Sequence, residues 1–531
     1  MIDQNDLSIG DHKMKSIRIQ NLRSLQDTGN IELRPITILL GENSSGKSTF
    51  LRSFPLFRQS QSTSITGPLL WFGQFVDFGS FDESISIHAK SKHMFFDFDF
   101  GRINFNRRYF VQNLPYHDNN QIDVKTHISI IGDAKREAIV NLCEIEIEEE
   151  HKIKIQINVD GNLSHFSING RDYLKVTPDM RSGHRRGLFP QLFISEFVDK
   201  SNAFIMRKRP NFRAYAISIL RDYVHHNTSD NKLEKLLLRL EIGSSKKMLE
   251  TMKKVPGSFL ASWASRTQGW SINSDEFIKI RDMLILVSIP DVFVMCDEEF
   301  ADFAENIRYI APLRATAERY YRRQNLAVDE VDFQGQNLAM FLKNLTDVEK
   351  RNFSNWIEDL FGFYPQAIQR GGHISLQLNQ GAQSRFNLAD MGFGYSQVLP
   401  ILTQLWQLSQ QRQQYRGYRR RKAPITFAVE QPELHLHPRM QMRVAKAFAN
   451  IIKEAQKQKI DLRLVIETHS EAIVNTLGRL IAEKKLSSDD VNVVIFEKPQ
   501  ADKSSEVRIS KYDEDGFLTN WPYGFFEPEA E

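Results

Sequence analysis

The feature that most constrains this chain is a glycine-rich loop near its N-terminus. Residues 41–49 read GENSSGKST, after an apolar run at residues 36–40 and before helical spacing at residues 50–54. A strand, a glycine-rich loop and a helix in this order are typical of a P-loop. The backbone N–H groups of such a loop and the N-terminus of its helix attract phosphate. The sequence therefore predicts an α/β core that binds a nucleotide.

All residues of the loop are candidate nucleotide contacts. The two glycines let the backbone approach phosphate closely, because they have no side chain. Lys47 is expected to reach the β- and γ-phosphates of ATP, and the Ser48 hydroxyl is expected to bind Mg²⁺. The full set is Gly41, Glu42, Asn43, Ser44, Ser45, Gly46, Lys47, Ser48 and Thr49.

Length, charge and cysteine content narrow the class of protein. The chain has 531 residues, enough for about two to four domains. Its net charge of +3 gives no sign of nucleic-acid binding, so any such contact must be a local basic patch. Two cysteines, Cys143 and Cys296, are too few for a disulfide scaffold and fit a reducing cytoplasm. The sequence has no secretory signal and no apolar run of about 18 residues, so we expect a cytoplasmic protein.

Changes in pattern along the chain predict a polar leader, a strand-rich half of an ATPase head, a helical insertion and a second α/β half. Within the strand-rich half, the acidic segment 143–148 and the basic segment 152–159 suit an antiparallel hairpin. Leucine and isoleucine at helical spacing distinguish the insertion. In chain order, the segments are residues 1–13, 14–185, 186–305 and 306–531.

Two buried strands in the second half end in residues that suit a nucleotide site. Residues 425–438 read ITFAVEQPELHLHP, and the acid that ends this apolar run is Glu430. An acid in this place is typical of a Walker B strand and is expected to hold Mg²⁺ or its water shell. Residues 464–470 read LVIETHS, a second apolar run that leads to His469.

A third motif lies at residues 390–400, which read DMGFGYSQVLP. Gly392, Gly394 and Ser396 precede an apolar helical run. We therefore expect a second helix N-terminus directed at phosphate.

The order of these motifs resembles the ABC/SMC-like ATPases of the RecF and OLD type, over residues 14–110 and 305–531. OLD-type enzymes carry a C-terminal Toprim nuclease, and we expect none here because the chain extends only about 60 residues past His469. The segments YIAPLR at 309–314, EQPE at 430–433 and NWPYGFF at 520–526 are similar to the PtuA-type ATPases of Septu antiphage systems. Some of those ATPases are encoded beside retrons.

The resemblance implies an ABC-type P-loop ATPase head, with a mixed sheet core, an antiparallel β subdomain and a helical insertion. Two heads would dimerise head to tail around two ATP molecules. The motif at residues 392–396 of one protomer would then meet the γ-phosphate held by the P-loop of the other. Glu430 would serve Mg²⁺, and His469 would sense the γ-phosphate.

The resemblance also implies a separate effector. In Septu-like systems this partner is an HNH-type nuclease, and in retron-linked systems it is a reverse transcriptase with its RNA–DNA hybrid. ATP binding would close the dimer, and loss of phosphate would release it. Two other interpretations stay open: a RecF-like DNA-repair ATPase that binds DNA directly, and a nucleotide-gated scaffold with negligible turnover.

One residue departs from the pattern of such ATPases. The position after the Walker B acid usually holds a glutamate that polarises the attacking water, and here it holds Gln431. Glutamine can orient water but is a poor base. We therefore expect either that hydrolysis is slow or that Glu433 polarises the attacking water in place of the missing glutamate.

A basic run with two interleaved tyrosines, Tyr415 and Tyr418, precedes the Walker B strand. Cations on phosphate and tyrosines on bases would suit nucleic acid; the alternatives are a solvated loop or a seat for an acidic partner. Its basic residues are Arg412, Arg416, Arg419, Arg420, Arg421 and Lys422.

Three smaller features complete the sequence expectations. His435 and His437 could suggest zinc with Glu433, but their spacing after a strand end predicts a structural turn. Arg314 is expected in a buried structural pair; the alternative is a basic surface that it shares with Arg319, Tyr320, Arg322 and Arg323. A glutamine that contacts the nucleotide is expected between residues 59 and 110, without a definite position.

Overall fold

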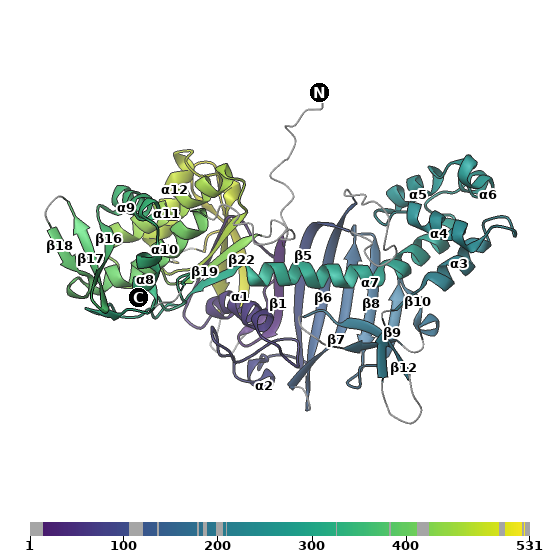
Figure 1. Ribbon diagram of the computed structural model, residues 1–531, viewed down its shortest axis with the longest axis horizontal. Coiled ribbons are helices and arrows are strands. Elements are labelled where there is room, and N and C mark those ends of the chain that lie inside the picture. Colours follow the sequence, from purple (N-terminus) through teal and green to yellow (C-terminus); the bar gives the residue numbers. More distant parts are fainter. Residues whose placement is uncertain are drawn as a thin grey trace.

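The computed structural model describes residues 14–105, 120–134, 137–177, 180–183, 188–197, 205–208, 210–324, 327–381, 384–410, 424–498, 505–522 and 525. These residues form an elongated molecule, with an α/β unit at one end, a large antiparallel sheet in the middle and short helices at the other end (Figure 1). Among them, no helix is long and apolar enough to cross a membrane. The predicted leader and the basic run at 412–422 lie outside the described residues.

A seven-stranded sheet carries the P-loop. Its order is β14-β19-β20-β4-β21-β22-β23, and the first five strands run parallel. The strands are β4 (Ile36–Gly41), β14 (Ile307–Ile310), β19 (Ile425–Glu430), β20 (Leu462–Glu467), β21 (Val491–Glu497), β22 (Glu506–Tyr512) and β23 (Leu518–Thr519). The parallel strands end at one edge, which is where open α/β sheets bind ligands.

Helices cover both faces of this sheet, so its central strands are buried on both sides. Along β4, Ile36, Ile38 and Leu40 face the core beneath α10, α11 and α12, whereas Leu39 faces the core beneath α1. These helices are α1 (Lys47–Ser62), α10 (Phe393–Gln410), α11 (Pro438–Lys457) and α12 (Glu471–Ala482).

A nine-stranded antiparallel sheet lies beside the α/β unit, in the order β10-β9-β8-β7-β6-β5-β1-β2 with β3 paired to β1. The predicted hairpin is β7 and β8, where Glu144 and Glu146 face Lys154 and Lys152 at 2.8 and 3.5 Å. The charge pattern of this hairpin is therefore confirmed. The strands are β1 (Ser16–Leu22), β2 (Leu25–Asp27), β3 (Ile31–Glu32), β5 (His93–Asn104), β6 (Gln121–Asp133), β7 (Glu137–Ile147), β8 (His151–Ile157), β9 (Leu163–Ile168) and β10 (Arg171–Asp172).

The long helix α7 (Asp275–Glu305) runs along this sheet (Figure 1). Its Phe300 ring contacts Phe57 of α1 and Phe98 of β5, with centroids 5.4 and 5.1 Å apart. Edge-on aromatic contacts of this kind add to the burial energy. Helix α7 therefore couples the helix that follows the P-loop to the antiparallel sheet.

The segment predicted as a helical insertion from residue 186 begins with strands instead. Strands β11 (Met180–Gly183), β12 (Gln191–Phe197) and β13 (Ile205–Lys208) form a small antiparallel sheet, and the first helix starts at Arg213. Residues 191–197 read QLFISEF, in which aromatic and β-branched residues favour a strand. The helices before α7 are α3 (Arg213–Arg221), α4 (Asp230–Arg239), α5 (Ser245–Lys253) and α6 (Gly257–Thr267), and a short α2 (Phe81–Ser84) follows α1.

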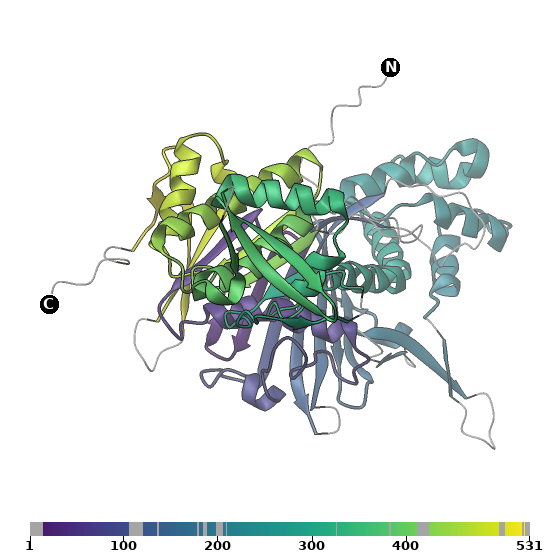
Figure 2. The same ribbon diagram turned by 60° about the vertical axis from the view of Figure 1, so that its left-hand side comes forward.

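A four-stranded antiparallel sheet projects from the α/β unit (Figure 2). In it β17 pairs with β15, β16 and β18. Helices α8 (Leu338–Asn344) and α9 (Asp347–Phe361) pack against one face of this sheet. The strands are β15 (Tyr321–Arg322), β16 (Tyr364–Arg370), β17 (His373–Gln380) and β18 (Ser384–Asn387).

Candidate nucleotide site

The P-loop connects β4 to α1 and needs glycine at two positions. Gly41 has φ 145°, and a Cβ there would lie 2.1 Å from the carbonyl oxygen of Phe496. Gly46 has φ 104°, and its Cβ would lie 2.5 Å from Leu25. Side chains at these positions would clash and would strain the backbone. The geometry therefore explains the two glycines of the motif.

Lys47 is the first residue of α1 and its side chain turns back into the loop. Its Nζ donates to the carbonyl oxygens of Gly41 and Glu42 at 2.8 and 2.5 Å. Burial lowers the pKa of Lys47, against the attraction of nearby carboxylates, of which Glu467 is the first. Of the other loop residues, Ser45 is buried, Ser48 and Thr49 are half-buried, and Glu42, Asn43 and Ser44 are exposed.

The structure places Glu467, rather than Glu430, against the Ser48 hydroxyl. Ser48 Oγ donates to Glu467 Oε1 at 2.7 Å, and Glu467 is the last residue of β20. The sequence predicted Ser48 and Glu430 as the metal ligands, and Glu467 was not among the predicted site residues. The available signal was an acid that ends a buried strand two residues before His469.

The Glu467 carboxylate is buried, with 2% of the residue exposed. Burial raises its pKa to about 7, and the nearby charge of Glu430 adds to this shift. The two acids are register partners on adjacent parallel strands. A divalent cation between them would remove this repulsion.

Glu430 ends β19 and is held by two side chains that the sequence analysis did not select for the site. Arg52 donates from Nε and Nη2 to Oε1 and Oε2 at 2.9 and 2.8 Å. The Tyr309 hydroxyl donates to Oε1 at 2.6 Å. The hydrogen bond to Glu430 raises the pKa of Arg52, so the guanidinium stays charged. Arg52 belongs to α1, so the pair fixes the P-loop helix against the Walker B strand.

Arg314 is buried, as predicted, but its partners are backbone groups. Its Nη2 donates to the carbonyl oxygen of Glu430 at 2.6 Å, and burial lowers its pKa to about 10. The next residue, Gln431, has φ 44°, and its N–H donates to the carbonyl oxygen of Glu467 at 2.8 Å. A left-handed conformation is costly for glutamine. These backbone contacts therefore fix the turn that follows the Walker B strand.

Glu433 and His469 meet across this turn. The His469 N–H donates to Glu433 Oε1 at 2.7 Å. Burial raises the pKa of Glu433, which suits a carboxylate that exchanges a proton. Burial, and then the charge of Lys47, lower the pKa of His469, so its imidazole is neutral at neutral pH. The structure therefore brings Glu433 and His469 to the edge where Lys47 lies.

The two histidines after Glu433 have structural positions. His435 has φ 60°, and His437 caps α11 by accepting from the Arg439 N–H at 3.3 Å. Within the described part of the chain, no group of three or more His, Cys, Asp or Glu residues is arranged to hold a metal ion. The turn predicted here thus has a helix-capping role.

The motif at residues 392–396 lies at the start of α10. A Cβ at Gly394 would lie 2.8 Å from the carbonyl oxygen of His435, so glycine permits close packing there. Ser396 Oγ donates to the carbonyl oxygen of Phe393 at 2.8 Å, and Ser396 is buried. Gly392 and Phe393 are exposed. Ser396 therefore contacts its own helix, and the predicted role toward a second protomer stays a prediction.

The residues around the P-loop fit a magnesium nucleotide. Within the described residues, Ser45 Oγ, Glu433 Oε2, Glu467 Oε2 and two nitrogens of Arg314 are buried without a hydrogen-bond partner. Unsatisfied buried polar atoms are costly, and a polar ligand would satisfy them. Lys47 and the loop N–H groups would hold the phosphates, and Ser48, Glu467 and Glu430 would hold Mg²⁺ or its water.

Comparison with known families agrees with this geometry. The family described as "AAA ATPase domain" matches residues 13–255 and 301–474, which is more than half of the chain. This chain belongs to the AAA ATPase domain family. The fold class expected from the sequence, an α/β P-loop ATPase head with an antiparallel β subdomain and added helices, is confirmed.

Other comparisons add little to the assignment of this AAA ATPase. No curated protein matches the chain. A Pyrococcus furiosus Smc head bound to the C-terminal domain of ScpA is 13% identical, with 94% of this chain and 96% of that chain covered and a TM-score of 0.32. The Thermotoga maritima SMC head is 8% identical, with 93% and 98% covered and a TM-score of 0.32. These values are too low to carry a structural argument.

Proposed function

We propose that this AAA ATPase is a nucleotide-gated switch with slow hydrolysis, which controls a separate nuclease in a bacterial antiphage system of the Septu type. The observation that carries the proposal is the arrangement at the sheet edge. Two buried acids, Glu430 and Glu467, flank a complete P-loop, whereas Gln431 occupies the position of the expected base. Such a site suits tight binding of a magnesium nucleotide better than rapid turnover.

Each residue has a distinct task in this proposal. Lys47 leaves the loop carbonyls and turns toward the phosphates, and Ser48 orients the metal. Glu467 and Glu430 hold the metal or its water, with Glu430 positioned by Arg52 and Tyr309. Bound Mg²⁺ supplies charge neutralisation at the phosphates.

Slow turnover follows from the chemistry at Gln431. An amide cannot accept a proton from water, and general-base catalysis contributes about 10²–10⁴-fold to a rate. Glu433 is the carboxylate best suited to substitute, because one of its oxygens is buried and has no partner among the described residues. Its other oxygen accepts from the backbone N–H of His469, so a movement of the backbone at His469 would reach this carboxylate directly.

Self-association would complete the site. The start of α10 presents Gly392 and the exposed Phe393 ring, 60% of which is accessible. We place this surface against the γ-phosphate of a second, head-to-tail protomer. Binding and loss of the nucleotide would then close and open the dimer.

The nuclease partner rests on the resemblance to Septu ATPases, through the motifs at residues 309–314, 430–433 and 520–526. An HNH-type nuclease is the partner that this resemblance favours. A reverse transcriptase with its RNA–DNA hybrid is the retron-linked form of the same assembly. Co-purification from the native host, followed by mass measurement of the complex, distinguishes the two.

Binding and turnover of ATP test the switch. Wild-type protein is expected to bind ATP and to hydrolyse it well below the ~10 s⁻¹ typical of enzymes. Lys47→Ala should lose ATP binding and phage protection. Gln431→Glu should raise turnover at least about tenfold, and Gln458→Glu, an exposed position on the same chain, should leave it unchanged. Full protection by Lys47→Ala, or a wild-type rate near ~10 s⁻¹, would contradict the proposal.

A further inference from the structure

The sheet formed by β15, β16, β17 and β18 has two chemically different faces. Ile374, Leu376 and Leu378 of β17 are buried in the core with α8 and α9. Residues that are register partners on adjacent antiparallel strands lie on the same face of the sheet. The pairing register therefore identifies which residues form the second face, away from α8 and α9. There His373 has Arg370 of β16 as one neighbour and Arg322 of β15 as the other.

This second face carries arginines at its two ends and uncharged polar side chains between them, and Asn379 near the far end is buried. Farther along β17, Gln377 lies opposite Gln366 and Asn387, and Asn379 lies opposite Arg385. None of the face's residues in the three strand pairings is a carboxylate. Arg322, Arg370 and Arg385 are exposed, and none has an ion pair within the described part of the chain.

Compensation by a carboxylate occurs beside this face but not on it. Nearby Arg319, which precedes β15, forms an ion pair with Asp390. The three arginines of the face have no such partner among the described residues, so their charge is available to an anionic ligand. An extended row of cations fits a polyanion better than a single phosphate.

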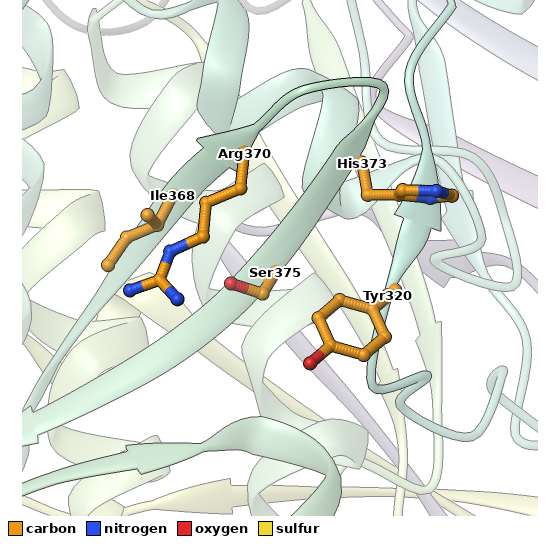
Figure 3. A pocket seen from close by; sticks show the side chains of 5 residues that line it. All are labelled: Tyr320, Ile368, Arg370, His373 and Ser375. Atoms are coloured by element: carbon orange, nitrogen blue, oxygen red, sulfur yellow. The ribbon is translucent and has the colours of Figure 1, made fainter.

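A recess of about 320 Å³ opens on this face and is lined by Tyr320, Ile368, Arg370, His373 and Ser375. Figure 3 shows the side chains of Arg370 and Ser375 directed toward the same space, with the Tyr320 ring below Ser375; His373 lies above that ring and is directed away from Arg370. The Tyr320 and His373 rings are 6.3 Å apart at 61°, and Tyr320 is 61% exposed. An exposed aromatic ring next to an arginine offers a stacking surface for a base and a contact for its phosphate.

We infer that this face binds single-stranded nucleic acid, with one base in the recess beside Tyr320 and phosphates on Arg322, Arg370 and Arg385. A recess that receives an unpaired base selects a single strand over a duplex. From His373 to Asn379 the strand extends about 20 Å, which suits the lower end of known site sizes, about four nucleotides. The site is separate from the P-loop and does not depend on the proposed function.

Fluorescence anisotropy of the full chain with a labelled dT12 oligonucleotide tests the site. Wild-type protein should bind dT12, with affinity that falls as salt rises from 50 to 200 mM. Arg370→Ala should lower the slope of log K against log salt by about 0.7, the value for one lost phosphate contact on a single strand. Tyr320→Ala should weaken binding about tenfold and leave the slope unchanged, because stacking releases no counterion.

Two matched variants control for charge and for aromatic surface. Arg351 is exposed on α9, and Phe386 is 45% exposed on the other face of the sheet. Arg351→Ala and Phe386→Ala should bind dT12 as wild type does, and all four variants should melt at the wild-type temperature.

Three results would overturn the inference. The first is no binding of dT12 at 50 mM salt. The second is wild-type binding by both Tyr320→Ala and Arg370→Ala, which would assign the binding to another surface such as the basic run at 412–422. The third is that the protein binds a 12-base-pair duplex more tightly than dT12 and that Tyr320→Ala binds this duplex as tightly as the wild type does. Loss of ATP binding in Lys47→Ala with intact dT12 binding would support the separation of the two sites.

Discussion

Glu467→Gln should stabilise the nucleotide-free protein and weaken its metal-dependent nucleotide binding. The amide keeps the shape of the side chain and can still accept from the Ser48 hydroxyl, which lies 2.7 Å from Glu467 Oε1 in the wild type. What it removes is a buried negative charge beside Glu430. The two effects have opposite signs, which distinguishes a residue placed for ligand binding from one placed for stability.

The magnitude follows from the pKa of Glu467. Burial raises this pKa from 4.5 to about 7 in the folded protein. The folded protein therefore holds a proton that the unfolded chain releases between these values, so wild-type stability falls as pH rises from about 4.5 to about 7. Above pH 7 the ionised carboxylate costs about 3 kcal/mol. Glu467→Gln should therefore raise the free energy of unfolding by about 3 kcal/mol at pH 8 and leave it unchanged at pH 4.5.

Chemical denaturation with EDTA at pH 4.5 and pH 8 measures the first effect, and ATP titration with and without Mg²⁺ measures the second. Glu318→Gln, at an exposed position, is the matched control and should change neither. The reasoning would be refuted if Glu467→Gln destabilised the protein at pH 8. It would also be refuted if the variant kept the full gain in ATP affinity that Mg²⁺ gives the wild type.

Two further substitutions test the packing around the site, and a third tests a buried acid on α7. Gly41→Ala should lower the free energy of unfolding by on the order of 3 kcal/mol and abolish ATP binding, because its Cβ would lie 2.1 Å from a backbone carbonyl. The control is Gly29→Ala, at a position with φ 59° and open space, which should cost only about 1 kcal/mol in the same denaturation assay. Tyr309→Phe should cost about 1–2 kcal/mol, since a buried hydrogen bond to Glu430 is lost, and an unchanged denaturation midpoint would contradict that role. Asp297→Asn should raise stability at pH 8 by about 4 kcal/mol but not at pH 4, because burial raises the Asp297 pKa from 3.8 to about 7; equal gains at both pH values would refute the burial argument.

The P-loop could be predicted from the sequence because its chemistry is local. Gly41, Gly46, Lys47 and Ser48 lie within one loop, and their spacing alone determines the backbone shape. The α/β core followed for the same reason, since each α/β motif has its own apolar run and turn, whereas the ABC-type head was implied by the family resemblance.

The acid that faces Ser48 could not be predicted in this way. It depends on strand order, because β20 lies between β4 and β19 in the sheet. The end of β20 is therefore nearer to the P-loop than the end of β19, and Glu467 contacts Ser48 while Glu430 contacts Arg52. Nothing in the local sequence distinguishes these two strand-terminal acids.

A residue can also have a structural role in a segment where the sequence predicts a functional one. A nucleotide-contacting glutamine was expected between residues 59 and 110, and Gln59 is buried there. Its amide donates to the carbonyl oxygens of Leu70 and Val76, and its carbonyl accepts from the N–H groups of Phe75 and Val76. Gln59 therefore fixes the loop after α1, a contact over 11–17 residues that local patterns do not encode.

A structure of the protein with Mg²⁺ and a non-hydrolysable ATP analogue tests the central claim most directly. The account predicts the metal about 2.1 Å from Ser48 Oγ, with Glu467 on the metal or its water and Lys47 on the terminal phosphates. A nucleotide bound away from the P-loop, or a metal with Glu467 still hydrogen-bonded only to Ser48, would contradict it.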